Sequence, residues 1–103
     1  MIRRRPFRDV IERQLALFAN EHAQLLEAVH AAERAYDHAD RDEAEERFGD
    51  YSDLVETATE VLADLRDHYA GRLGDDAAEA YCEAFNRAVL KRWPPFALEL
   101  ENR

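Results

Sequence analysis

His22 is the residue whose type and position best suit chemistry inside a folded core. It is the one polar member of an apolar series with helical spacing, which predicts that its imidazole faces the interior. With Glu56 and Tyr81 as neighbours, such a histidine can bind a ligand or transfer a proton. The alternative is a structural histidine, because a buried polar side chain needs only a hydrogen-bond partner. The sequence leaves both interpretations open.

A second pair, Glu27 and His30, has the Glu-x-x-His spacing found in the di-iron helices of ferritin-like bundles. Both residues flank the apolar series instead of lying at its centre. No second Glu-x-x-His pair follows on the next predicted helix. A metal site needs enough ligands that point inward together. We therefore predict no metal site. Glu27 and His30 are the only residues that we name as candidate metal ligands.

The other residue types exclude several classes of site. A single cysteine, Cys82, allows neither a disulfide framework nor a cysteine-rich zinc site. The chain has no glycine-rich phosphate loop and no nucleotide-binding motif. We predict no catalytic residue and no cofactor.

The charge is strongly acidic, with 23 Asp and Glu against 14 Lys and Arg and a formal net charge of −9. This charge argues against nucleic-acid binding, since a general nucleic-acid binder needs surplus positive charge. A basic cluster near the N-terminus leaves one alternative, a small regulator that contacts nucleic acid or an acidic partner. Residues 1–5 are predicted to form a flexible basic arm, and the cluster comprises Arg3, Arg4, Arg5, Arg8 and Arg13.

The elements that position these residues are helices. Strong helix formers, with alanine the commonest, dominate the 103 residues, while β-branched residues, glycine and proline are scarce. Apolar residues in alternating steps of four and three predict one helix over about residues 6–37 and a second over about 41–71. Asp40 resembles the cap of the second helix. The series keeps its phase across Gly49, so we expect no break there.

A third helix is predicted over about residues 76–92, where Pro94 and Pro95 end it. The fold class is therefore all-α, with a long antiparallel helical hairpin, a third helix and an apolar C-terminal tail at residues 93–103. We expect one domain over residues 1–103, a three-helix bundle that dimerisation can complete to a four-helix or larger bundle.

The third helix is too short to cover the whole hairpin, so the half near the loop keeps an uncovered apolar stripe. Either the tail folds back along this stripe or a second copy of the chain docks there. We favour a homodimer with a contribution from the tail. The predicted interface consists of Leu25, Val29, Tyr36, Phe48, Tyr51, Trp93 and Phe96.

These observations predict a non-enzymatic helical bundle that self-associates and serves as a protein-interaction or structural module. A ligand- or metal-binding bundle centred on His22 is the alternative. The longest early apolar run, residues 15–19, is too short for a signal peptide. No segment has the length of a membrane span. We expect a cytoplasmic protein with no membrane partner.

Overall fold

The computed structural model describes residues 7–103, and this part of the chain consists of helices and their connections, with no strand. The predicted all-α fold class is confirmed. The predicted basic arm at residues 1–5 lies outside the described residues. The five helices are α1 (Arg8–Glu21), α2 (Ala23–Asp37), α3 (Ala44–Ala70), α4 (Asp75–Arg92) and α5 (Pro94–Glu101).

The prediction of one continuous helix over residues 6–37 is wrong, because the chain distorts at His22 and divides the helix into α1 and α2. His22 has φ −116° and ψ 31°, outside the helical region. Its N–H still donates to the carbonyl of Phe18, and its own carbonyl accepts from the N–H of Leu26. A single distorted residue therefore bends the axis while the apolar series keeps its phase on both sides.

The second predicted helix is confirmed as one unbroken element that passes through Gly49, and it begins three residues later than expected. Residues 41–43 form a turn in which the N–H of Glu43 donates to the carbonyl of Asp40. No side chain caps α3, so the predicted role of Asp40 as its cap is wrong. Glycine at position 49 is tolerated because packing on both sides of it outweighs its low helix propensity.

The predicted tail forms a helix of its own. Pro94 and Pro95 end α4 as expected, but they also occupy the first turn of α5. Proline suits that position because the first N–H groups of a helix have no intrahelical partner. Trp93 separates the two helices with φ −139° and ψ 73°, which turns α5 away from the axis of α4.

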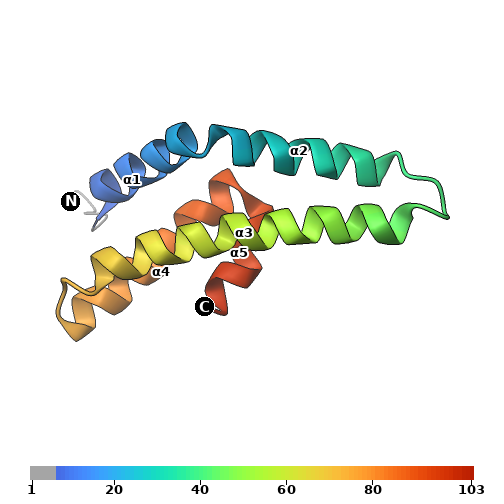
Figure 1. Ribbon diagram of the computed structural model, residues 1–103. Helices are drawn as coiled ribbons and strands as arrows, with labels where there is room; N and C mark the ends of the chain where they lie inside the picture. The colour runs from blue at the N-terminus through green and yellow to red at the C-terminus, as the bar shows by residue number, and fades with distance from the viewer. Residues whose placement is uncertain (1–6) are drawn as a thin grey trace.

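The helices form a long hairpin that is covered on one side at one end only (Figure 1). α2 lies antiparallel along the first part of α3. α1 packs on α4, and α5 packs on both α3 and α4. The described residues extend over 54 × 26 × 23 Å, so the hairpin projects well beyond the covered end.

We call residues 23–58 the distal hairpin, and the other described residues, 7–22 and 59–103, the helical core. The helical core holds most of the buried apolar side chains. Thirteen apolar residues are buried among the described residues, and only three of them belong to the distal hairpin, namely Val29, Val55 and Ala58. The ten others are Ile11, Leu15, Phe18, Leu62, Ala63, Tyr81, Phe85, Val89, Phe96 and Leu100.

Candidate functional site

The three residues of the predicted ligand site occupy separate surroundings. His22 is half-buried at the junction of α1 and α2, with its ring 5.3 Å from that of Phe18. The hydroxyl of Tyr81 donates to Oε1 of Gln14 at 2.6 Å. Gln14 precedes His22 by eight residues, which is about 12 Å along a helix. Glu56 is exposed, and its Oε1 lies 4.0 Å from Nη2 of Arg103.

Tyr81 is fully buried in α4, among the rings of Phe7, Tyr69 and Phe85. Burial raises the pKa of Tyr81 to about 12. The phenol is therefore neutral near pH 7, and its hydroxyl is engaged by Gln14. This arrangement is suited to packing and to one internal hydrogen bond, not to proton transfer at physiological pH.

The candidate metal ligands Glu27 and His30 are both exposed on α2. Within residues 7–103, no group of three or more His, Cys, Asp or Glu side chains is placed to hold a metal ion. Cys82 is half-buried on α4, and burial raises the pKa of its thiol. A thiol with a raised pKa is a poor nucleophile, because the thiolate is the reactive form.

Arg66 is the important polar residue that the sequence analysis missed. Only 4% of it is exposed, although it carries a charge. Its Nε donates to Oδ1 of Asp67 at 2.8 Å, and its Nη1 donates to Oδ1 of Asn86 and to the carbonyl of Leu100 at 3.0 and 2.9 Å. Leu100 lies in the last turn of α5, and its carbonyl also accepts from the N–H of Arg103. Arg66 therefore joins α3, α4 and the C-terminal end of α5.

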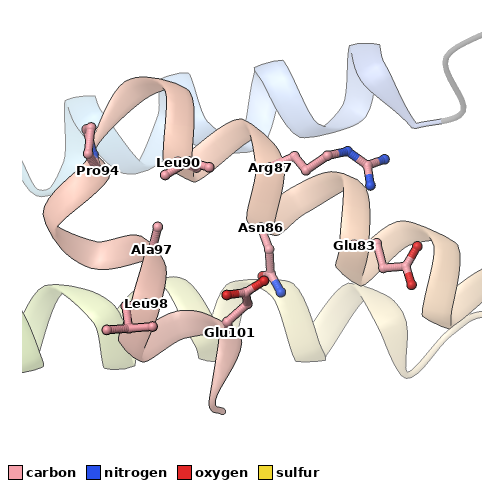
Figure 2. Close-up of a pocket in the computed structure, with 8 residues that line it drawn as sticks. All are labelled: Glu83, Asn86, Arg87, Leu90, Pro94, Ala97, Leu98 and Glu101. Atoms are coloured by element: carbon pink, nitrogen blue, oxygen red, sulfur yellow. The ribbon is translucent and has the colours of Figure 1, made fainter.

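A shallow groove of about 510 Å³ lies between α4 and α5. Figure 2 shows its lining, with Leu90, Pro94, Ala97 and Leu98 as the apolar part and Arg87 and Glu83 extending from α4. Asn86 and Glu101 complete the lining. These residues include no histidine, cysteine, serine or threonine, so the groove lacks a nucleophile paired with a base.

The distal hairpin carries the second apolar surface. Tyr36 of α2 and Phe48 of α3 lie against each other, with their ring centroids 5.4 Å apart. The exposed fractions are 39% for Tyr36 and 50% for Phe48. Tyr51, one turn further along α3, is half-buried. Burial and the nearby carboxylate of Glu33 raise the pKa of Tyr51, so it is neutral as well.

The position of Phe48 on α3 explains its exposure. It precedes Arg66 by eighteen residues, which is five helical turns, so both side chains lie along the same face of α3. At Arg66, this face is covered by α5 and α4. In Figure 1, neither α4 nor α5 lies along the first part of α3, the part that contains Phe48. The distal hairpin therefore continues a face that the helical core buries.

The predicted interface residues divide into two groups. Val29 and Phe96 are buried within the chain. The other five keep accessible surface, and they are Leu25, Tyr36, Phe48, Tyr51 and Trp93.

Comparison of the chain with protein-family models, with curated proteins and with solved structures finds no match. Among the described residues, no helix is both long enough and apolar enough to cross a membrane.

Proposed function

We propose that this protein is a non-enzymatic helical module that associates with a second copy of itself through the distal hairpin. The observation that carries the proposal is the exposed aromatic pair of Tyr36 and Phe48 on a face that is buried further along α3. A two-helix hairpin buries little apolar surface by itself, and an apolar stripe of this kind marks an interaction surface.

The C-terminal helix supports this proposal, because it covers a different part of the hairpin. Arg66 of α3 donates a hydrogen bond to the Leu100 carbonyl of α5, and Arg103, two residues beyond α5, contacts Glu56 of α3. α5 therefore lies over the part of α3 near residues 56–66. The tail is engaged there, and the stripe around Phe48 is left for another molecule.

The polar residues of the chain support a role without catalysis. The hydroxyl of Tyr81 and the guanidinium of Arg66 each make hydrogen bonds within the helical core. Both therefore stabilise the fold. The candidate ligand residues His22, Glu56 and Tyr81 share no hydrogen bond or ion pair within residues 7–103.

The test is the solution mass, measured by light scattering after size exclusion over a wide range of protein concentration. We expect a dimer, and we expect Phe48→Ser to shift the dimer towards the monomer at least tenfold in dissociation constant. The matched control is Leu17→Ser on α1, since Leu17 is 51% exposed but lies outside the distal hairpin. A wild-type protein that stays monomeric at every concentration would contradict the proposal, as would equal effects of the two substitutions.

A further inference from the structure

The charge of the chain is concentrated in the distal hairpin. Residues 23–58 contain eleven acidic and three basic residues, a formal charge of −8. The rest of the chain contains twelve acidic and eleven basic residues, a charge of −1. The highest density lies at the tip, residues 37–46, where six carboxylates accompany Arg41 alone. Any surface that receives this tip must carry positive charge.

The helical core offers such a surface at the base of the distal hairpin. Lys91 and Arg92 are exposed in the last turn of α4. The guanidinium of Arg92 lies over the ring of Trp93, 4.6 Å from its centroid, which restricts the position of the charge. The Trp93 ring is 5.3 Å from that of Phe18 in the last turn of α1. α4 therefore ends beside the junction of α1 and α2, where the distal hairpin begins (Figure 1).

Within one chain these opposite charges are far apart. The fifteen residues of α2 separate the base from the tip, a length of about 22 Å at 1.5 Å per residue. Electrostatic interactions in water are screened over about 8 Å at physiological ionic strength. The tip and the base of the same chain therefore hardly attract each other.

We infer that two copies pair with their distal hairpins antiparallel, so that the acidic tip of each lies against Lys91 and Arg92 of the other. This inference rests on the self-association proposed above and adds its geometry. A two-fold axis at the middle of the hairpins makes both contacts equivalent. It also covers the apolar surface of each distal hairpin with the distal hairpin of the other copy. A parallel arrangement would instead bring the two acidic tips together, which like-charge repulsion opposes.

The experiment uses two charge-reversed variants of the full chain. One carries Lys91→Glu and Arg92→Glu at the base, and the other carries Asp40→Lys and Asp42→Lys at the tip. All four residues are exposed, so both variants are expected to fold like the wild type. The base variant alone places like charges at both contacts, and the tip variant alone reduces the charge of residues 37–46 from −5 to −1. We expect the dissociation constant of each variant to rise at least tenfold. An equimolar mixture keeps one wild-type contact and pairs the two introduced lysines with the two introduced glutamates at the other, and we expect a heterodimer close to wild-type affinity.

The matched control is Arg13→Glu with Arg72→Glu, which changes the net charge by the same amount at exposed sites outside the distal hairpin. Native mass spectrometry of the mixture separates homodimers from heterodimers. If the base variant dimerises as well as this control, or if the mixture forms no heterodimer, the antiparallel pairing is wrong. In that case a wild-type dimer sensitive to Phe48→Ser would leave the proposed function standing. A monomeric wild type would overturn both.

Discussion

The distal hairpin and the helical core are formed by the same kind of sequence, but they are stabilised very differently. In both, apolar residues recur in steps of four and three, and α3 runs through both without a break. The helical core adds a third layer, α4 and α5, and ten of its apolar residues become buried, while Leu17, Leu90 and Leu98 stay exposed on its outer surface. The distal hairpin has two helices only, and its aromatic residues stay partly exposed. A heptad pattern therefore predicts that helices pair, while burial depends on the number of layers.

The polar contacts of the two regions differ in the same way. Arg66 in the helical core is buried and bonded to three helices. In the distal hairpin, Arg47 lies 3.7 Å from Glu43 and 4.0 Å from Asp50, with all three side chains largely exposed. Exposed ion pairs of this type contribute little, about 0–1 kcal/mol. These exposed pairs therefore stabilise the distal hairpin less than the buried contacts of Arg66 stabilise the helical core.

The largest expected effect comes from a leucine-to-alanine substitution, made once in the helical core and once in the distal hairpin, at two positions of α3. Leu62 is fully buried in the helical core, and Leu54 is half-buried in the distal hairpin. Leu62→Ala leaves a cavity and should lower the free energy of unfolding by about 3–4 kcal/mol. Leu54→Ala removes contacts from a surface that water already reaches, so the free energy of unfolding should fall by only about 1 kcal/mol. Urea denaturation measures both values.

This measurement is made at a protein concentration where the wild type is monomeric, because a docked second copy would bury Leu54 further. Similar losses for the two variants would mean that the distal hairpin is as well covered as the helical core. A rise in the Leu54→Ala effect with protein concentration would support self-association.

A smaller effect is expected from alkaline pH. The pKa of Tyr81 is about 12 in the folded protein against 10.0 for a free tyrosine. Below pH 10 the phenol is neutral in both states, so its full contribution to stability is present. Between pH 10 and 12 the unfolded chain ionises first, and stability should fall by about 2–3 kcal/mol. Tyr81→Phe removes this part of the pH dependence, which thermal unfolding across that range detects.

Tyr51 serves as the comparison in the distal hairpin, since its pKa is also raised. It is half-buried, whereas Tyr81 has no exposed surface. The Tyr51→Phe variant should therefore keep most of the alkaline loss seen in the wild type. If Tyr51→Phe abolishes the loss of stability at alkaline pH and Tyr81→Phe does not, the attribution of that loss to Tyr81 is wrong.

The sequence was sufficient for the fold class and for the unbroken course of α3, because both depend on local spacing. The uninterrupted passage through Gly49 followed from the phase of the apolar series. The distortion at His22 could not be predicted in the same way. It keeps the phase of the series, and it falls where the packing partner changes from α4 for α1 to α3 for α2. The helix at residues 94–101 was missed because two prolines indicate an end, although they also suit a first helical turn.

The residues that hold the molecule together were harder to predict than the helices. Arg66 has the residue type of an exposed position, and its burial arises only because Asn86 and the end of α5 surround its guanidinium. These partners are 20 and 34 residues away, so no local pattern indicates them. The sequence did place Tyr36 and Phe48 on the uncovered half of the hairpin, since that prediction needs only helix lengths and phase.

The smallest expected effect tests whether the distal hairpin is limited by its own helix propensity. Gly49 lies within α3, and a Cβ added there meets no atom within 4 Å. Gly49→Ala should therefore raise the free energy of unfolding by about 0.5–1 kcal/mol, because alanine restricts the unfolded chain and favours the helix. At Gly71, where α3 ends, the added Cβ would lie 3.4 Å from the carbonyl oxygen of Asp67. Gly71→Ala is thus the matched control, and a smaller gain is expected in urea denaturation. If Gly49→Ala instead lowers the free energy of unfolding, the monomeric distal hairpin packs more tightly around this residue than two helices alone allow.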